Sequence, residues 1–557
     1  MCIRDRPKTG YWTTKTAHII SQLKAWYGEA ATKENDWAYD YIPKRASADD
    51  YSHQHMLVEM NKGKIKGFIC IGQNPAVDSP NSKMGRKGVA NLEWLVVQDL
   101  FVTETAEFWK EKGVHGKDQS VDPKSIKTEV FLLPGAPAAE KDGSLTNTMR
   151  LIQWHAKAVE PPGDARSDAA FFYDLGLRLK KLYAISKAKK DRPILDLVWD
   201  YQHDPKDRKV EPKMELVLKE VNGYATRDIL DKEGKVVLKK GQPVPGFAAL
   251  KDDGSTACGN WIYSGVYPEE GKNLAARREK ATSAGDYMNH NWGFAWPANR
   301  RILYNRASAD PSGKPWSEKK KLIWWDEAQK KWVGNDVPDF KADLPPDAPM
   351  LKEGPFRGLG GQDPFIMRAD GKGALFGPLL DGPFPEHYEP FESPTPNLLS
   401  KVNNNPVAKV WDIGDLNKLG KPDEYPVVLT TYRLTEHHAA GMSRHVPWLS
   451  AMFSGHFAEI SHELAAEKGI KNGEMITVVT PRGKIHLRAL VTERFRPFII
   501  NGKKVHQIGI PWHWGWLGVM PSAIGDVTND LVASIGDPNV FIQESKALLC
   551  DVKKGEV

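Results

Sequence analysis

The sequence has few cysteines, and their spacing does not suit a metal site. The four cysteines stand at positions 2, 70, 258 and 550, and no two of them form a CxxC pair. Structural zinc sites and iron–sulfur clusters usually draw their ligands from closely spaced cysteine pairs. The cysteines of this chain therefore provide no ligand set for either kind of centre, and they are too few for a disulfide scaffold.

Long hydrophobic runs and an excess of one kind of charge are also missing. No apolar stretch approaches the ~20 residues of a membrane-spanning helix, and the start, MCIRDRPKTGYW, lacks the apolar core of a secretory signal. The formal net charge is +6, with both signs interspersed. Because a nucleic-acid-binding protein usually concentrates Lys and Arg on one stripe, this balance favours an anionic small ligand or no charged partner.

The pattern of predicted elements changes along the 557 residues, which are too many for one core. Amphipathic helices are predicted at 16–28 and 166–185. From about 50 to 155, short apolar strands such as KIKGFICIG, LEWLVVQD and TEVFLLPG alternate with helices. That alternation predicts a parallel sheet of the nucleotide-binding kind.

The sequence after about residue 200 predicts two other kinds of structure. From about 200 to 410, Pro, Gly, Asp and Trp dominate, which predicts an irregular segment packed over its neighbours. From 425 onward, alternating apolar residues predict a short β-barrel with a helix over its mouth. Ser461 is the expected N-cap of that helix and Gly469 its C-terminal stop. The fold class is therefore α/β plus β, in three parts at 1–195, 196–410 and 411–557.

Polar residues gather where the predicted parallel strands end. The loops at 72–75, 98–105 and 134–150 are rich in Gly, Asn, Thr and Asp. Ligands of parallel sheets bind beyond the carboxyl ends of the strands. These loops therefore predict a ligand site.

A second candidate site is the stretch TTYRLTEHHAAGMSRHVPWLS at 430–450. Its basic and imidazole side chains are Arg433, His437, His438, Arg444 and His445. The histidine spacing is a weak metal signal, since neighbouring residues of a strand point to opposite faces. A hydrolase would pair His437 with Ser443, but no strand–turn–helix elbow surrounds that serine. An anion-binding loop and a merely solvated basic loop remain as alternatives.

Several phrases of the sequence carry a family resemblance. In the predicted barrel they are TTYRLTEHH, EISHELAAEKGIKNGEMITVVTPRGKI, GIPWHWGW and ESKALL. Upstream they are GQNPAVDSPN, LVVQDLFVTETAEFW, AAEKDGSLTNTMRLIQWHAKAVEPPGDARSD, WPANRRILYNRASADPSGKPW and GPFPEHYEP. From about residue 11 to the end, the chain resembles the molybdopterin oxidoreductases, and most closely the major subunit of the respiratory formate dehydrogenases.

This resemblance implies an enzyme that oxidises formate to CO2 in anaerobic respiration. The implied cofactor is a pair of molybdopterin guanine dinucleotides holding molybdenum or tungsten. The implied partners are formate, an iron–sulfur electron-transfer subunit and a membrane cytochrome b subunit, in a membrane-associated periplasmic complex without nucleic acid. The segments 1–195 and 411–557 would be dinucleotide-binding domains, the first of them partial.

The sequence also departs from this family. The family's subunit begins with a four-cysteine motif for a [4Fe-4S] cluster and then carries a cysteine or selenocysteine, beside a histidine, that ligates the metal. This sequence contains neither. We therefore expect the chain to be the C-terminal part of such a subunit, inactive alone, with no catalytic residue or metal ligand of its own.

The resemblance also implies contacts to the cofactor. Gly72 and Asn74 would let the backbone approach it closely, Asp99 would accept from a guanine or ribose edge, and Thr103 would donate to phosphate. Asp99 has an alternative role, as a cap of the loop that follows it.

In the barrel, Arg433 would offer its guanidinium to phosphate and His437 an N–H to the pterin. Trp512 and His513 would pack against the pterin or simply close the barrel. The remaining expected contacts are Asn147, Arg150, Asn529 and Lys546.

Two further functions stay open. The chain could belong to a relative acting on nitrate, a sulfur compound or an arsenic oxyanion; a cysteine or selenocysteine at the metal would favour formate over these. It could instead be a binding protein that holds a nucleotide-like cofactor without performing chemistry.

Overall fold

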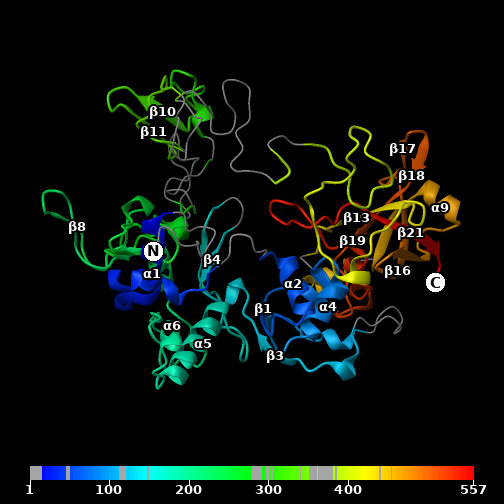
Figure 1. The fold of residues 1–557 in the computed structure, drawn as a ribbon, viewed down its shortest axis with the longest axis horizontal. Coiled ribbons are helices and arrows are strands. Elements are labelled where there is room, and N and C mark those ends of the chain that lie inside the picture. Colours follow the sequence, from blue (N-terminus) through cyan, green and yellow to red (C-terminus); the bar gives the residue numbers. More distant parts are fainter. Residues whose placement is uncertain are drawn as a thin grey trace. The chain divides into compact units, whose positions relative to one another are not determined.

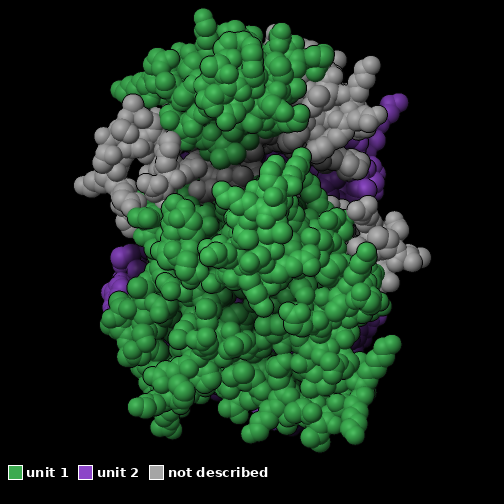
Figure 2. All heavy atoms as spheres, turned by 90° about the vertical axis from the view of Figure 1, so that its left-hand side faces the viewer, with its two compact units in different colours: residues 1–49, 136–376 green, residues 50–135, 377–557 purple. Residues whose placement is uncertain are grey.

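The computed structural model divides the chain into two compact units. Unit 1 comprises Met1–Asp49 and Ala136–Phe376, and unit 2 comprises Asp50–Gly135 and Gly377–Val557 (Figure 2). The residues described are 15–44, 51–111, 121–146, 150–277, 292–295, 302, 305–338, 340–349, 361, 380–382, 386–437, 441–452 and 455–557. The division into parts at 1–195, 196–410 and 411–557 stays a prediction.

Unit 1 is built from short elements. Its helices are α1 (Thr16–Tyr27), α5 (Asp168–Tyr183), α6 (Arg192–Leu195) and α7 (Met214–Asn222). Its strands are β4 (Gly143–Leu145), β5 (Gln153–His155), β6 (Tyr224–Ala225), β7 (Ile229–Leu230), β8 (Val236–Leu238), β9 (Thr256–Ala257), β10 (Ile323–Asp326) and β11 (Lys331–Gly334). In the described part of unit 1 these strands pair only in twos. The predicted helices at 16–28 and 166–185 are confirmed as α1 and α5 (Figure 1).

Unit 2 contains the predicted parallel sheet. Strands β1 (Gly67–Ile71), β2 (Trp94–Asp99) and β3 (Glu129–Pro134) pair in parallel in the order β1-β2-β3. The helices beside them are α2 (His53–Asn61), α3 (Pro75–Asp78) and α4 (Ser82–Ala90). The Ser52 side chain accepts from the N–H of His55 and starts α2, and Leu95 and Val97 of β2 lie in the core with residues of α2 and α4.

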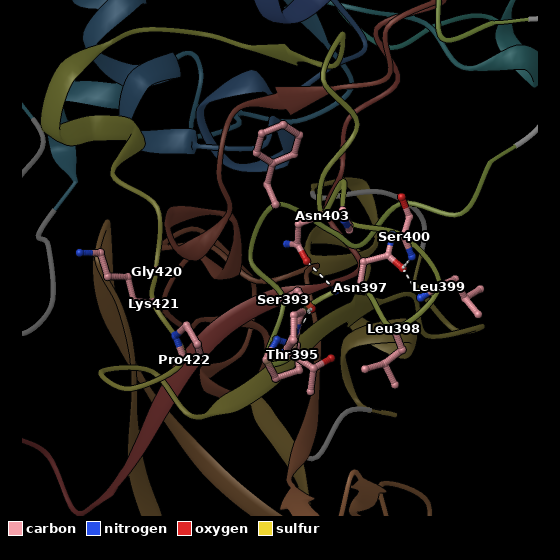
Figure 3. A pocket seen from close by; sticks show the side chains of 14 residues that line it. Ser393, Thr395, Asn397, Leu398, Leu399, Ser400, Asn403, Gly420, Lys421 and Pro422 are labelled. Carbon is pink, nitrogen blue, oxygen red and sulfur yellow. Dashed lines mark hydrogen bonds between the residues drawn. The ribbon is translucent and has the colours of Figure 1, made fainter.

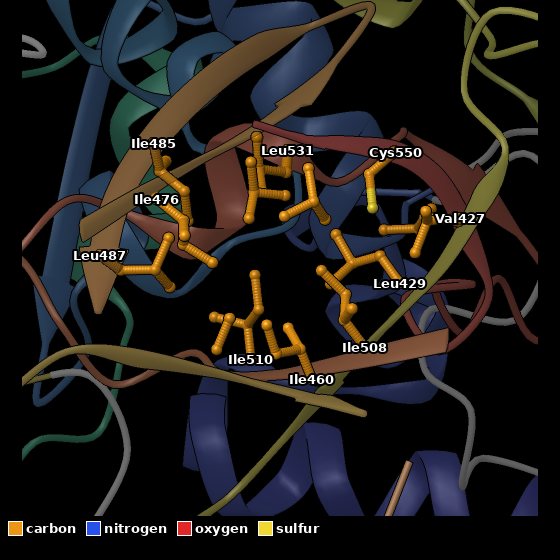
Figure 4. Close-up of a cluster of buried hydrophobic side chains, with 14 of the residues drawn as sticks. Val427, Leu429, Ile460, Ile476, Ile485, Leu487, Ile508, Ile510, Leu531 and Cys550 are labelled. Carbon is orange, nitrogen blue, oxygen red and sulfur yellow. The ribbon is translucent and has the colours of Figure 1, made fainter. Parts of the chain in front are cut away.

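The barrel of unit 2 is also confirmed. It is closed, in the strand order β13-β19-β14-β16-β15-β21. The strands are β13 (Val427–Tyr432), β14 (Phe457–Ser461), β15 (Met475–Thr480), β16 (Gly483–Thr492), β19 (Gln507–Pro511) and β21 (Leu548–Lys554). Alternate residues of these strands point into one apolar interior, where Leu429, Ile460 and Ile508 are fully buried (Figure 4).

One helix packs against the barrel core, and its predicted position over the mouth of the barrel stays a prediction. In α9 (His462–Lys468), Leu464 and Ala465 are buried with the barrel interior. Ser461 accepts from the N–H of Leu464 at 3.0 Å, and Gly469 ends the helix in a left-handed conformation with φ of 64°. Both predicted caps are therefore confirmed.

Short elements complete unit 2. They are α8 (Pro447–Ser450), β12 (Lys409–Val410), β17 (Phe498–Ile500), β18 (Lys503–Val505), β20 (Ile535–Gly536) and the 3-10 turns η15 (Met442–His445) and η17 (Thr528–Leu531). Across the described residues of both units, none of the helices combines the length and the hydrophobicity needed to cross a lipid bilayer.

Candidate functional site

The loop after β1 is held in place by the side chain of Asn74. Its amide oxygen accepts from the N–H and the hydroxyl of Thr105, and its amide nitrogen donates to Glu104 at 2.7 Å. Asn74 thereby joins the loop after β1 to the loop after β2. Gly72 has a φ of 62°, and a Cβ added there would meet open space, so the exposed backbone of this glycine is accessible to a ligand.

Asp99 ends β2 with its carboxylate turned to its own loop. It accepts from the N–H of Leu100 at 2.7 Å. Desolvation by burial raises the pKa of Asp99 above its ordinary value, although the N–H groups of Leu100 and Phe101 act against that rise. The carboxylate therefore caps its loop, and contact with a guanine stays a prediction.

Thr103 carries a buried hydroxyl at the end of the same sheet. Its side chain is 2% exposed, and Oγ1 has no hydrogen-bond partner within the described residues. A Cβ built on Gly441, in the barrel-side loop, would lie 3.7 Å from Cγ2 of Thr103 and 3.6 Å from Nδ2 of Asn74. The sheet-end loops and the loop before η15 are therefore in close contact. A buried hydroxyl without a partner is unfavourable, so a ligand that bonds to it would gain affinity.

A fully buried ion pair joins these two regions. Arg444 of η15 donates to both carboxylate oxygens of Glu104, at 2.7 and 2.9 Å, and neither side chain is exposed. Glu104 also accepts from the N–H of Leu517 at 2.9 Å. The loop after β2, η15 and the loop after β19 are thus fixed together at one carboxylate.

A stack of rings lies next to this pair. His437 stacks on His513 with ring centroids 4.7 Å apart, and His513 stacks on Trp512 at 5.0 Å. Nδ1 of His437 lies 2.8 Å from the Ser443 hydroxyl, and Nε2 of His513 accepts from the N–H of Leu434. Burial, with repulsion from His513 and Arg444, lowers the pKa of His437 to about 3, so its ring is neutral at neutral pH.

Two basic side chains flank the stack. The guanidinium of Arg433 lies 5.3 Å from the ring centroid of Trp512. Lys546 donates to the carbonyl of Thr431 at 2.6 Å, and desolvation with repulsion from Arg433 lowers its pKa. The cation pair lies at the end of β13, and an anion between the two groups would relieve their repulsion.

Asn529 anchors α3 to the barrel. Its amide donates to the carbonyls of Val77 and Asp78, at 3.2 and 2.8 Å. Beside it, Arg86 of α4 is completely buried and donates to both oxygens of Asp530. The amide of Asn529 is therefore used within the chain, and its contact with a cofactor stays a prediction.

Ten of the expected site residues lie in unit 2. These are Gly72, Asn74, Asp99, Thr103, Arg433, His437, Trp512, His513, Asn529 and Lys546. Arg150 belongs to unit 1, where it donates to the carbonyl of Ala295 at 3.0 Å. Asn147 and His438 lie outside the described residues.

The sequence does not single out Glu104, whose one signal is its place in the loop at 98–105, beyond the end of a predicted parallel strand. Arg444 is one of several basic residues in the 430–450 stretch. Among the described residues, no group of three or more His, Cys, Asp or Glu side chains could hold a metal ion.

Comparison with known proteins shows which family two segments of this chain resemble. Residues 427–540 match the family model of the molydopterin dinucleotide binding domain, and residues 131–177 match that of molybdopterin oxidoreductase. The first match begins at β13 and includes most of the barrel. Both matched segments are therefore similar to the molybdopterin oxidoreductases.

Two of the relatives that the chain resembles are subunits of formate dehydrogenases. The chain is 40% identical over 551 residues to the nitrate-inducible formate dehydrogenase major subunit of Escherichia coli. It is 42% identical over 554 residues to the formate dehydrogenase 2 subunit alpha (cytochrome c-553) of Nitratidesulfovibrio vulgaris. Each alignment covers 98% of this chain and 51% of the relative. The chain thus spans about half the length of the curated relatives it matches.

The groups present in unit 2 fit a dinucleotide of this kind. Arg433 and Lys546 would provide cationic donors for a pyrophosphate, and Thr103 has a buried hydroxyl without a partner among the described residues. Gly72 leaves its backbone open. His513 is fully buried between other rings, so it touches a ligand only if its neighbours move; in this structure it positions Trp512.

Proposed function

We propose that this chain forms part of the major subunit of a formate dehydrogenase and binds molybdopterin guanine dinucleotide. The observation that carries the proposal is the identity of 40% and 42% to two such subunits over 98% of the chain. The proposal includes two dinucleotides around one molybdenum or tungsten ion. It also includes an iron–sulfur subunit and a membrane cytochrome b subunit as partners, on the periplasmic side of a membrane.

Each predicted contact has a chemical role in this proposal. Arg433 and Lys546 bind the pyrophosphate, and the Thr103 hydroxyl donates to a phosphate oxygen. Trp512 packs against the pterin, and the neutral His437 supports that packing through His513. Gly72, Asn74, Asp99 and Asn529 shape the loops around the dinucleotide. Asn147 and Arg150 are proposed as further contacts.

The cofactor, when bound, supplies the two-electron chemistry in which formate yields carbon dioxide, a proton and two electrons. This chain binds and orients the dinucleotide and keeps water away from it. Glu104 and Arg444 hold the sheet-end loops against the barrel. Donors of the sheet-end loops and donors of the barrel can therefore reach the same ligand.

A chimera tests the substrate. This chain would replace the matching 552 residues of the Escherichia coli formate dehydrogenase-O major subunit, to which it is 41% identical. We expect the chimera to reduce a dye with formate and not to reduce nitrate with reduced dye. A chimera that loads its cofactor but acts on nitrate alone would assign the chain to a different member of the family.

Cofactor binding is tested on the chain itself. The protein would be purified from cells that make the dinucleotide and treated with acid, and the released GMP would be measured. Arg433→Ala combined with Lys546→Ala should lower the GMP yield at least about tenfold, since each bond to a charged group contributes about 1.5–3 kcal/mol. Lys503→Ala, on β18, is the matched control. Absence of GMP from the parent chain would contradict cofactor binding by this chain.

A further inference from the structure

A cavity in unit 2 lies among residues that the proposed function does not use. It has a volume of about 820 Å³ and is lined by the loop at 391–403 and the turn at 420–422 (Figure 3). That volume lies within the range of about 300–1,000 Å³ that is usual for ligand sites.

The two walls of this cavity are fixed by a buried ion pair. Glu392 is 1% exposed and accepts two hydrogen bonds from Arg482, at 2.5 and 3.1 Å. The same carboxylate accepts from the N–H of Gly420 at 2.6 Å and from the N–H of Leu549 at 2.9 Å. Glu392 therefore ties the loop at 391–403 and the turn at 420–422 to barrel strand β21, so the cavity is formed before a ligand arrives.

Asn397 shapes the rim of the cavity. Its side-chain oxygen accepts from the N–H groups of Leu399 and Ser400, and its amide donates to the carbonyls of His387 and Val402. The turn held in this way exposes 58% of Leu398 and 82% of Leu399. The rim of the cavity therefore carries two neighbouring exposed leucines, an apolar surface that a bound molecule would cover.

The charge of the lining is one-sided. It includes Lys401 and Lys421, and none of the lining residues is acidic. Neither lysine forms an ion pair with another residue in the described part of the chain. The nearby carboxylate of Glu392 is buried and bound to Arg482. The lining therefore carries two lysines and no carboxylate beside two exposed leucines, while the exposed Asp423 and Glu424 follow Lys421 outside the lining.

We propose that this cavity binds a peptide segment of a partner protein that combines acidic and apolar side chains. Charge complementarity with Lys401 and Lys421 selects acidic residues, and Leu398 and Leu399 give the apolar residues a surface to cover. The Ser393 hydroxyl is already used within the chain, since it donates to Glu389 and to the carbonyl of Thr395. A peptide still fits better than a lipid chain because the lining also contains the hydroxyl groups of Thr395 and Ser400, which can donate to a peptide carbonyl. An acyl chain offers these groups no acceptor.

Fluorescence anisotropy with the full chain tests this proposal. The probe is a labelled peptide of sequence Asp-Leu-Glu-Pro-Leu-Glu-Asp-Leu, and its comparison peptide has Asn and Gln in place of Asp and Glu. We expect saturable binding of the acidic peptide with a Kd below about 1 mM, and weaker binding at high salt. The neutral peptide should bind at least about tenfold more weakly.

Charge reversal provides the decisive comparison. Lys401→Glu combined with Lys421→Glu should weaken binding of the acidic peptide at least about tenfold, and Leu399→Ser should weaken it as well. Lys503→Glu reverses an exposed charge elsewhere in unit 2 and should leave binding unchanged. The proposal is overturned if the acidic peptide shows no binding at concentrations up to about 1 mM, which corresponds to a binding free energy of about −4 kcal/mol. It is equally overturned if the double variant binds the acidic peptide as tightly as the parent does. It is also overturned if vesicles with phosphatidylglycerol, and not the peptide, bind in a manner that the double variant abolishes.

Discussion

The carboxylate of Glu104 and the guanidinium of Arg444 meet at 2.7 and 2.9 Å without any exposure of either side chain. The two residues are 340 positions apart. Burial alone would raise the pKa of Glu104, but the charge and hydrogen bonds of Arg444 bring it below its ordinary value. The pair is thus ionised, and it holds the loop after β2 against the barrel.

Loss of one partner should be more damaging than loss of both. Arg444→Met leaves a buried carboxylate without its counter-ion and should lower the free energy of unfolding by about 3–5 kcal/mol. Adding Glu104→Gln should restore part of that loss, because the remaining group is neutral and still accepts from Leu517. Denaturant unfolding of the four proteins of the cycle measures the coupling. Additive effects would show that the pair contributes no interaction energy.

Asp78 should make the protein less stable as the pH rises. Burial raises its pKa from 3.8 to about 6, so the folded state keeps a proton that the unfolded state releases. The contribution of Asp78 to the free energy of unfolding is therefore complete below about pH 4 and falls by about 3 kcal/mol as the pH rises through about 6. Asp78→Asn, which keeps an oxygen for the N–H of Asn74, should raise the melting temperature at pH 7.5 and not at pH 4. An equal shift at both values would argue against the raised pKa.

The sheet and the barrel could be predicted from the sequence because their signals are local. Apolar strands mark β1, β2 and β3, and Ile485, Leu487 and Ala489 alternate into the barrel core. The caps at Ser461 and Gly469 also depend only on neighbouring residues.

The geometry of the site could not be predicted, because its contacts join distant segments. Arg86 meets Asp530 across 444 positions, and neither residue stands in a local pattern that indicates a partner. The sequence likewise does not reveal that the amides of Asn74 and Asn529 are already used within the chain. The structure has two compact units, and the division into three parts at 1–195, 196–410 and 411–557 stays a prediction.

Ser461 allows a direct test of the predicted cap. Its hydroxyl accepts from Leu464 at the start of α9, so Ser461→Ala should lower the free energy of unfolding by about 1 kcal/mol. Ser461→Thr keeps the hydroxyl and serves as the control, measured by the same denaturant titration. A loss that is equal in both variants would point to tight packing around the side chain, which is 1% exposed, instead of the cap.

His456 should contribute to acid unfolding. It stacks on Trp514 with centroids 4.9 Å apart, its Nε2 lies 3.0 Å from the Thr528 hydroxyl, and burial lowers its pKa from 6.5 to about 3. Below pH 6.5 His456 binds a proton in the unfolded state but stays neutral in the folded state. The stability that the neutral ring contributes is thus complete above pH 6.5 and falls by about 1.4 kcal/mol for each pH unit below it. His437, whose pKa is also lowered to about 3, adds a second such loss.

The variant His456→Gln should therefore lose about 2 kcal/mol less unfolding free energy than the parent when the pH falls from 7 to 5. Denaturant unfolding at both pH values measures this difference. His462→Gln, at the exposed start of α9, is the matched control. If His456→Gln and the parent lose equal stability, protonation of His456 does not drive the acid unfolding of this protein.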